Sequence, residues 1–472
     1  MRLFVATLCA TLISSAACAS PNFVVILTDD QEDTGSMAYM PKTLSLLAEH
    51  GVTFTNSFVN LPLCAPSRAS FLTGQAAHNH LIIDNGSASE KFTNYEKNAL
   101  PVWLQETGYK TALFGKYING YGKSKQPKSG SRYWTELISR WTSLAGGASA
   151  RTRVPPGWHL WYGSINESYY DHSINENGKV LTFGHEPSDY STDVLRNRAV
   201  RFIKDQAGST EPFFVLIATK AAHGQGAKGV KGRAIPSPAY QDKLVDVKLP
   251  RQPAHDEQAV SNKPPGRTRG PNWQRGDEKA YRAALQSLLS VDDLVQAVVN
   301  ALQDARKIEN TVVIYTSDNG FIYGTPGREG KNTPYEGSIR VPLLMRGPGI
   351  PENATRSQLV NNLDVVATIV ELAGAKPGFQ FDGRSLVPLF TDANASWRST
   401  ILIDGGKATA VRTEFRKYAR SKDGFEELYD LRADPYELEN KADSPSYASD
   451  LTALRRIHDN LTSCAGASCW IP

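Results

Sequence analysis

The run Phe23-Val24-Val25-Ile26-Leu27-Thr28-Asp29-Asp30 decides the fold class of this 472-residue chain. Consecutive apolar residues that stop at two carboxylates are typical of a strand buried on both faces of a parallel sheet. In open α/β sheets, ligands bind at the carboxyl ends of such strands. The run therefore predicts a buried strand that presents Asp29 and Asp30 at a ligand-binding edge, although two such residues alone more often form a turn or a helix cap.

Two later apolar runs repeat this pattern. Phe213 to Ala218 precedes His223, and Val312 to Thr316 precedes Ser317-Asp318-Asn319-Gly320. Residues Tyr281 to Ala305 carry leucines and valines near a period of 3.6, which predicts an amphipathic helix. The alternation of strands and helices predicts an α/β sandwich in which three strands deliver polar residues to one edge of the sheet.

The pattern changes after about residue 390. We expect a main domain over residues 20–390 and a smaller C-terminal subdomain over residues 391–472, with an antiparallel sheet and a closing helix. Gly-, Pro- and Lys-rich segments at about 124–156 and 224–275 predict long loops within the main domain. The expected C-terminal elements are strands at Thr400–Ile403, Ala408–Arg412, Arg416–Ala419 and Glu427–Tyr429 and a helix at about Tyr447–Leu461.

The first nineteen residues have the features of a secretory signal peptide. Met1-Arg2 precedes an apolar stretch from Leu3 to Ile13, and the small-residue sequence Ala17-Cys18-Ala19 precedes Ser20. No later segment approaches eighteen uninterrupted apolar residues. We therefore expect a secreted, extracellular protein without a membrane anchor, with a periplasmic or lysosomal location as alternatives.

The cysteines also fit export. Cys9 and Cys18 lie in the predicted signal peptide, which leaves Cys64, Cys464 and Cys469. In an oxidising compartment the last two most simply form a small-loop disulfide, and two free thiols are the alternative. Candidate N-glycosylation sequons begin at Asn85, Asn166, Asn353, Asn394 and Asn460.

Cys64 begins the most specific motif of the chain, Cys64-Ala65-Pro66-Ser67-Arg68-Ala69-Ser70-Phe71-Leu72-Thr73-Gly74. A lone Cys in a soluble protein is usually a small buried hydrophobe. Here, however, the pattern C-x-P-S-R followed by T-G resembles the motif of the type I, formylglycine-dependent sulfatases. In that family a formylglycine-generating enzyme oxidises the Cys to an aldehyde, whose hydrate attacks sulfur and later expels sulfate. The resemblance therefore implies that Cys64 is the precursor of a formylglycine.

The resemblance runs from about residue 21 to the end of the chain and is closest to the N-acetylglucosamine-6-sulfatase and extracellular arylsulfatase branch. It implies an alkaline-phosphatase-like α/β sandwich with a large mixed sheet. It also implies hydrolysis of sulfate monoesters, on sulfated sugars or polysaccharides such as N-acetylglucosamine-6-sulfate-type glycans and on aryl sulfates. The supporting segments are Gly115-Lys116-Tyr117, Pro156-Gly157-Trp158, Leu249-Pro250-Arg251, Ser290-Val291-Asp292-Asp293 and Arg340-Val341-Pro342-Leu343.

Oxygen side chains at two strand ends predict a hard cation. Asp29, Asp30, Asp318 and Asn319 suit Ca²⁺, or alternatively Mg²⁺, and do not suit zinc. The resemblance implies that these four residues and the modified Cys64 are the metal ligands.

A transition state that gathers negative charge on sulfate oxygens also needs cations and an acid. The resemblance implies that Arg68 holds the formylglycine hydrate, that Lys116 and Lys331 bind the sulfate, and that His223 protonates the leaving alcohol. A lone Lys is usually solvated surface, and a His after a strand is as often structural. The chain departs from the family at Ile118 and Ile322, where many members carry His.

Charge and the departures leave alternatives open. The formal net charge of +4, from 52 basic and 48 acidic residues, is too balanced for a nucleic-acid-binding protein. The basic stretch between Lys116 and Arg153 is either a solvated loop or a surface that steers a polyanionic substrate into the site. The alternative functions are a phosphonate monoester or phosphodiester hydrolase with the same nucleophile and a glycan-binding protein without catalysis.

Overall fold

The computed structural model describes residues 20–33, 35–123, 150–227, 230–250, 253, 273–324 and 329–471. The predicted signal peptide at residues 1–19 and most of the basic stretch after Lys116 lie outside the described residues, as does much of the predicted loop at 224–275.

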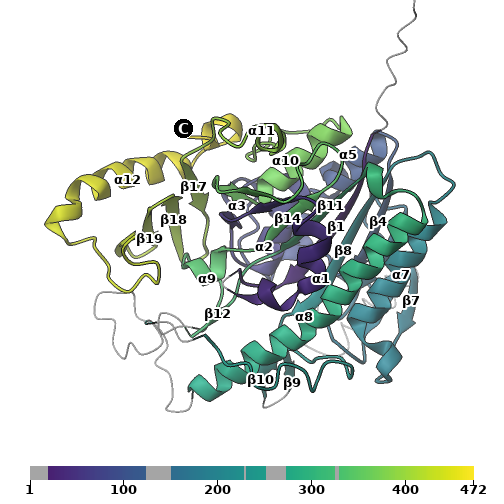
Figure 1. Cartoon of the computed structure of the whole chain (residues 1–472). Coiled ribbons are helices and arrows are strands. Elements are labelled where there is room, and N and C mark those ends of the chain that lie inside the picture. Colours follow the sequence, from purple (N-terminus) through teal and green to yellow (C-terminus); the bar gives the residue numbers. More distant parts are fainter. Residues whose placement is uncertain are drawn as a thin grey trace, which may run out of the picture.

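A large mixed sheet lies at the centre of the protein (Figure 1). Strand β1 (Asn22–Asp29) is flanked by β8 (Phe213–Ala222) and β11 (Thr311–Ser317), and both neighbours run parallel to it. The three runs that the sequence predicts as buried strands are therefore adjacent, and their carboxyl ends meet at one edge. Within the described residues the sheet order is β15 (Ala354–Arg356), β2 (Val52–Phe54), β14 (Leu343–Arg346), β11, β1, β8, β4 (Lys110–Gly115), β5 (Leu160–Ser164), β6 (Ser173–Glu176) and β7 (Lys179–Thr182).

Helices cover both faces of this sheet, which explains why β1 is apolar without alternation. Val24 and Ile26 belong to the core cluster on the face of α7 (Ser191–Asp205) and α8 (Trp273–Asp304), the two long helices in front of the sheet in Figure 1. The other face packs on helices α2 (Cys64–Thr73), α5 (Leu100–Glu106) and α10 (Asn362–Ala373). The predicted α/β sandwich and its mixed sheet are confirmed.

Helix α8 begins at Trp273, eight residues before the predicted start at Tyr281. The residues between them, Gln274 to Ala280, are almost all polar or glycine and so carry no apolar period. The apolar period marks only the part of the helix that packs on the sheet.

The C-terminal sheet and helix are also confirmed (Figure 1, green to yellow). The antiparallel strands β17 (Thr400–Ile403), β18 (Ala408–Thr413), β19 (Arg416–Ser421) and β20 (Glu426–Asp430) lie within two residues of the predicted bounds. Helix α12 (Ala448–Leu461) packs on this sheet through Leu451, Leu454 and Leu461. Cys464 and Cys469 form a disulfide just after the helix. The division at residue 390 stays a prediction.

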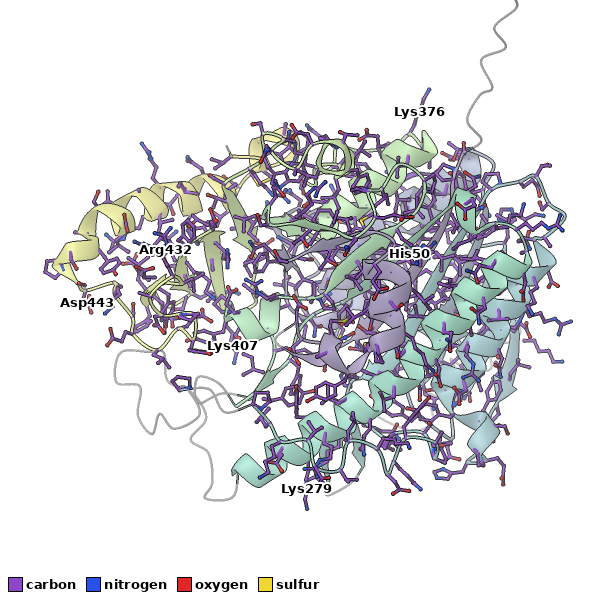
Figure 2. The ribbon with its side chains drawn as sticks, in the orientation of Figure 1. His50, Lys279, Lys376, Lys407, Arg432 and Asp443 are labelled. Carbon is purple, nitrogen blue, oxygen red and sulfur yellow. A yellow bond between two sulfur atoms is a disulfide. The ribbon has the colours of Figure 1, made fainter. Side chains whose placement is uncertain are left out.

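Lys376 and Lys407 are exposed, and the side chain of Lys376 projects from the top of the molecule in Figure 2. Among the described helices, none combines the length and the apolarity needed to cross a membrane. The shorter described elements are α1 (Pro41–Thr43), α3 (Ala77–His80), α4 (Ala88–Phe92), α9 (Glu336–Ile339), α11 (Val387–Thr391), β3 (Ser57–Phe58), β9 (Gln225–Ala227), β10 (Val230–Arg233), β12 (Ile322–Tyr323), β13 (Glu329–Gly330) and β16 (Val360–Asn361).

Candidate active site

The ends of β1 and β11 place four oxygen-bearing side chains together. Asp29 ends β1 and is fully buried, and Asp30 follows it with a φ of 63°, a left-handed conformation that Asp tolerates better than most residues. The backbone N–H of Asp30 donates to Oδ1 of Asp318 at 3.3 Å. Nδ2 of Asn319 donates to Oδ1 of Asp30 at 2.6 Å. Contacts between Asp30 and Asp318, 288 residues apart in sequence, thus link the carboxyl ends of the two strands.

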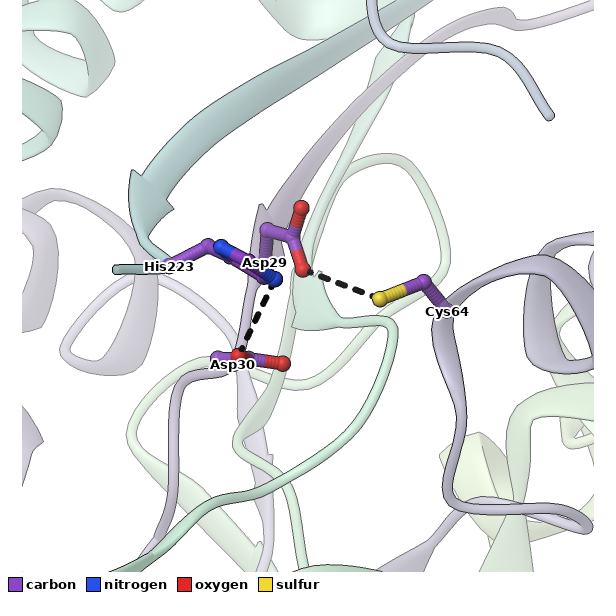
Figure 3. Close-up of side chains that lie close together, drawn as sticks. All are labelled: Asp29, Asp30, Cys64 and His223. Atoms are coloured by element: carbon purple, nitrogen blue, oxygen red, sulfur yellow. Dashed lines mark hydrogen bonds and ion pairs between the residues drawn. The ribbon is translucent and has the colours of Figure 1, made fainter. Parts of the chain in front are cut away.

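Cys64 faces these carboxylates from the first residue of α2 (Figure 3). Its Sγ lies 3.5 Å from Oδ1 of Asp29, and the backbone N–H of Ala65 donates to Oδ1 of Asn85 at 3.0 Å. Burial, reinforced by the charge of Asp29, raises the pKa of the Cys64 thiol to about 12. The thiol is therefore protonated near neutral pH and is a poor nucleophile as it stands.

Three cations surround the carboxylates and Cys64. Nζ of Lys331 lies 2.7 Å from Sγ of Cys64 and also contacts Oδ1 of Asp30. Nζ of Lys116 lies 2.6 Å from Oδ2 of Asp29. Burial alone would lower the pKa of both lysines, but the neighbouring carboxylates raise it, so both ammonium groups stay charged.

Arg68 is the third cation and lies one helical turn after Cys64. Its Nε donates to Oδ2 of Asp318 at 2.7 Å, and its Nη1 donates to the carbonyl of Lys116 at 2.9 Å. Nη2 is buried and has no hydrogen-bond acceptor among the described residues. Arg68 therefore fixes Asp318 and Lys116 while one guanidinium nitrogen remains available for another acceptor.

The pKa values of the buried carboxyl groups of Asp29 and Asp318 are shifted in opposite directions. Burial opposes ionisation of Asp29, but Lys116, with His223 and Lys331, holds the pKa of this carboxyl well below its usual range. Burial and the negative charge of Asp29 instead raise the pKa of Asp318. The negative charge of the site is therefore most firmly held at Asp29.

His223 follows β8 and is the most exposed member of the group, with 32% of its side chain accessible. Its Nε2 lies 3.6 Å from Oδ2 of Asp30 (Figure 3). Its Nδ1 lies 2.5 Å from the carbonyl oxygen of Gly224, which assigns the Nδ1 proton to that hydrogen bond. Nε2 is the ring nitrogen left to exchange a proton in the site.

The donor set fits a hard cation. Ligand atoms of Asp29, Asp30, Cys64 and His223 lie within 4.8 Å of one another. The buried Oδ1 of Asn319 has no hydrogen-bond donor among the described residues, as expected of a carbonyl oxygen that a cation would satisfy. Asp29, Asp30 and Cys64 of this group belong to the expected ligand set, and His223 is the additional member. Of the other two expected ligands, Asn319 offers an amide oxygen, and Asp318 accepts hydrogen bonds from Arg68 and from the backbone of Asp30.

The structure also brings in residues that the sequence did not single out. Oε2 of Glu167 lies 3.0 Å from Nζ of Lys116, and Asn85 holds the first turn of α2. Lys220 in β8 is buried beside them. Glu167 and Asn85 lie in sequons, a pattern that points to glycosylation and not to a site, so no sequence signal distinguished them.

The two departures from the family have a structural explanation. Ile118 is 1% exposed within the main core, and Ile322 is 2% exposed against Tyr335 and Tyr429. These positions therefore contribute to packing and not to ligand contacts. Asn119, next to Ile118, has a buried Oδ1 without a hydrogen-bond partner among the described residues.

The predicted sequons fall into two groups. Asn353, Asn394 and Asn460 are exposed. Asn85 and Asn166 are partly buried, and the side chain of Asn166 bonds to Asp171 and Ser173. Glycosylation stays a prediction at all five, and the exposed group is the more accessible.

Comparisons with known proteins give matches over most of the chain. A family model described as Sulfatase matches residues 21–375, and one described as N-sulphoglucosamine sulphohydrolase, C-terminal, matches residues 327–464. The chain is 36% identical over 409 residues to the N-acetylglucosamine-6-sulfatase of Homo sapiens, which covers 83% of this chain and 68% of that protein. It is 34% identical over 428 residues to a Caenorhabditis elegans protein named as an extracellular sulfatase Sulf-1 homolog, which covers 86% of this chain and 55% of that protein.

The fold has a similar solved relative. A structure described as a complex with its substrate D-glucosamine-2-N,6-O-disulfate has a TM-score of 0.73 at 21% identity. The match covers 93% of this chain and 97% of that chain. At this identity, the similarity concerns the fold alone.

Proposed function

The chain belongs to the sulfatase family, and we propose that it hydrolyses sulfate monoesters of sugars with a formylglycine formed from Cys64. The observation that carries this proposal is the position of Cys64. Its side chain lies at the start of a buried helix, within 3.5 Å of Asp29 and 2.7 Å of the ammonium of Lys331. A polar, cation-lined setting of this kind suits a group that handles sulfate and does not suit a packing cysteine.

Two groups would complete the site. Asp29, Asp30, Asp318 and Asn319 would hold Ca²⁺ or Mg²⁺. A buried site built from several protein oxygens favours Ca²⁺, because Mg²⁺ gives up its water ligands reluctantly. A bound divalent cation supplies positive charge to sulfate oxygens, and a hydrated formylglycine supplies the nucleophilic hydroxyl. Nη2 of Arg68 has no hydrogen-bond acceptor among the described residues and would bind an oxygen of that hydrate.

The remaining residues would bind the ester and move the proton. Lys116 is buried, Lys331 is only 13% exposed, and both are charged, so they would stabilise the negative charge that develops on sulfate oxygens. His223 is accessible and has Nε2 free of backbone partners, so it would protonate the departing alcohol. Its Nδ1 contact with Gly224 fixes the ring in the orientation that this transfer needs.

The proposed substrate class is inferred from the names of the relatives. A human relative is named N-acetylglucosamine-6-sulfatase. We extend this to sulfated glucosamine or sulfated polysaccharides as the substrate, with activity on aryl sulfates as well. A relative named as extracellular supports secretion after removal of residues 1–19, and maturation would then require a formylglycine-generating enzyme. The unit over residues 20–390 would carry catalysis.

The test combines mass spectrometry with kinetics. In protein secreted by its native host, we expect the Cys64 peptide to be about 18 Da lighter than its thiol form and to react with hydrazine. Hydrolysis of 4-nitrophenyl sulfate should exceed hydrolysis of the matched phosphodiester and vanish in Cys64→Ala. A faster phosphodiester reaction would instead identify a phosphodiesterase, and an unmodified thiol without turnover would identify a glycan-binding protein.

A second test asks whether the physiological substrate is a polyanionic polysaccharide. If the basic stretch after Lys116 steers a polyanion, added salt will raise KM on a sulfated polysaccharide much more than KM on 4-nitrophenyl sulfate. Equal salt effects on the two substrates would exclude this role.

A further inference from the structure

Lys220 is a cation of this site that the proposed mechanism does not use. It lies in β8, three residues before His223, and is only 8% exposed. Within the described residues, its ammonium has no ion-pair partner and no hydrogen-bond acceptor, and it lies 5.7 Å from the centre of the Tyr169 ring. A buried cation without an anionic partner is unfavourable, so its presence needs an explanation.

The backbone places Lys220 between two residues that would contact the substrate. The N–H of Lys116 donates to the carbonyl of Ala218 at 2.9 Å, and the N–H of His223 donates to the carbonyl of Lys220 at 2.8 Å. The hydroxyl of Tyr169 donates to the carbonyl of His223 at 2.9 Å. Tyr169, whose ring contacts the ammonium of Lys220, is thus also hydrogen-bonded to the backbone of His223, the candidate acid.

The charges around Lys220 are those of the site. Its neighbours are Asp29, Lys116, Glu167 and Asp30. Asp29 and Asp30 already contact Lys116 and Lys331, and Glu167 is paired with Lys116 at 3.0 Å. No carboxylate of the described site is therefore left for Lys220. Burial and the like charge of Lys116 lower the pKa of Lys220, although Asp29 acts in the opposite direction.

We propose that Lys220 is a further substrate-binding residue, whose ammonium binds an anionic oxygen of the substrate beside Lys116 and His223. The inference rests on the proposed function, since that function supplies the anion. Two sources share this chemistry. One is the sulfate group that is cleaved, and the other is a second anionic group on the same sugar.

Three probes separate the two sources. Inorganic sulfate as an inhibitor and 4-nitrophenyl sulfate as a substrate carry only the sulfate group, whereas D-glucosamine-2-N,6-O-disulfate carries a second anion. Loss of one charge-assisted hydrogen bond should weaken binding about tenfold or more in Lys220→Met. A rise in KM for the aryl ester and in Ki for sulfate assigns Lys220 to the cleaved group, and a rise in KM for the disulfated sugar alone assigns it to the second anion.

Control variants separate binding from folding. Lys220→Arg keeps the charge and should recover part of the affinity, and Lys220→Gln serves if the Met variant does not fold. Lys110→Met is the matched control. Lys110 begins β4, at the end of the strand opposite to Lys116 and the site, and it pairs with Glu211 on the surface. A structural role would lower the melting temperature and kcat while Ki for sulfate stayed constant. Wild-type Ki and KM values in folded Lys220→Met or Lys220→Gln would overturn the proposal.

A direct binding measurement separates this inference from the proposed function. Titration calorimetry with inorganic sulfate needs no turnover. If wild-type protein binds sulfate but does not hydrolyse sulfate esters, the proposed function fails, while weaker binding by Lys220→Met still supports the inference. If the wild type hydrolyses sulfate esters and the variant binds sulfate equally well and keeps its KM on both substrates, the inference fails alone.

Discussion

The ammonium nitrogen of Lys331 lies 2.7 Å from Sγ of Cys64. Lys331 also contacts Asp30 and lies 3.9 Å from Oδ1 of Asp29, so one cation touches both the candidate nucleophile and the candidate metal ligands. The contact joins two segments that are 267 residues apart in sequence. It therefore depends on the fold of the whole sandwich.

Replacement of Lys331 by Met should lower kcat/KM on 4-nitrophenyl sulfate by about 100- to 1000-fold, the usual cost of losing a group that stabilises developing charge. The stem of Met fills similar space, so the fold should persist. Lys407→Met, at an exposed position in the turn between β17 and β18, is the control and should keep wild-type kinetics. Equal formylglycine content in the Cys64 peptides of both variants must be shown. Kinetics of Lys331→Met within threefold of wild type would contradict the role given to this lysine.

Removal of the metal should abolish hydrolysis and lower the melting temperature. Asp29, Asp30 and Asp318 converge in a buried space, and without a divalent cation part of their repulsion is uncompensated. We expect EDTA to inactivate the enzyme and Ca²⁺ to restore it at lower concentration than Mg²⁺. Asn319→Leu should raise the Ca²⁺ concentration needed for half-maximal activity. Full activity after exhaustive chelation would exclude a metal role for these residues.

The strand ends and the Cys64 motif could be predicted because each is a local pattern. An apolar run that stops at Asp29 or at Asp318 identifies the edge of a parallel sheet without knowledge of its neighbours. Glu167 and Lys220 could not be found in this way, since only the fold brings them to Lys116. Glu167 comes from the loop after β5, and Lys220 comes from β8, which pairs with β4 just before Lys116. The environment of Ile322 could not be predicted either, because its burial depends on Tyr335 and Tyr429, which are distant from it in sequence.

The start of α8 and the disulfide also show the difference between features that a local sequence pattern marks and features that it does not. Apolar periodicity does not mark the polar segment Gln274 to Ala280, which belongs to α8 although it carries no apolar period. The pairing of Cys464 with Cys469 needed only their spacing and an oxidising compartment.

Stability should fall between pH 6.5 and pH 4 partly because of His80. Burial lowers the pKa of this imidazole to about 4, with Asp404 and His78 as its charged neighbours. The N–H of Ile82 donates to its Nδ1 at 3.1 Å, so protonation of Nδ1 breaks a buried hydrogen bond. A His with a depressed folded pKa contributes stability that is fully present above its unfolded pKa of about 6.5 and is lost as the pH falls through about 4.

The full contribution is roughly 3 kcal/mol, since each pKa unit corresponds to about 1.4 kcal/mol. Melting temperatures measured from pH 7 to pH 4 should therefore fall less steeply for His80→Gln than for wild type. His50→Gln changes an exposed histidine and should leave the slope as in wild type. Parallel slopes for wild type and His80→Gln would show that His80 does not carry the acid sensitivity.

Loss of the Asn85 side chain should weaken the first turn of α2. Its Oδ1 accepts the backbone N–H of Ala65, next to Cys64, and the loss of such a cap costs about 1 kcal/mol. Asn85→Ala should lower both the melting temperature and kcat, whereas Asn85→Asp keeps the acceptor and should retain both. Because both variants remove the sequon, a glycan effect would appear equally in the two, and equal losses would therefore refute the capping role.

Glu167 should control how strongly Lys116 attracts sulfate. Its Oε2 lies 3.0 Å from Nζ of Lys116, and although burial opposes ionisation, Lys116 lowers the pKa of Glu167, so the carboxylate is charged and offsets part of the lysine's positive charge. Glu167→Gln keeps the shape of the side chain but removes this charge, so Ki for inorganic sulfate should fall about two- to fivefold as repulsion of the anion is relieved. Tighter product binding should then slow release and lower kcat. Glu186→Gln, an exposed acid before α7, is the control. A higher Ki in Glu167→Gln would mean instead that Glu167 orients Lys116, because a misplaced ammonium binds sulfate less well even when its charge is unopposed.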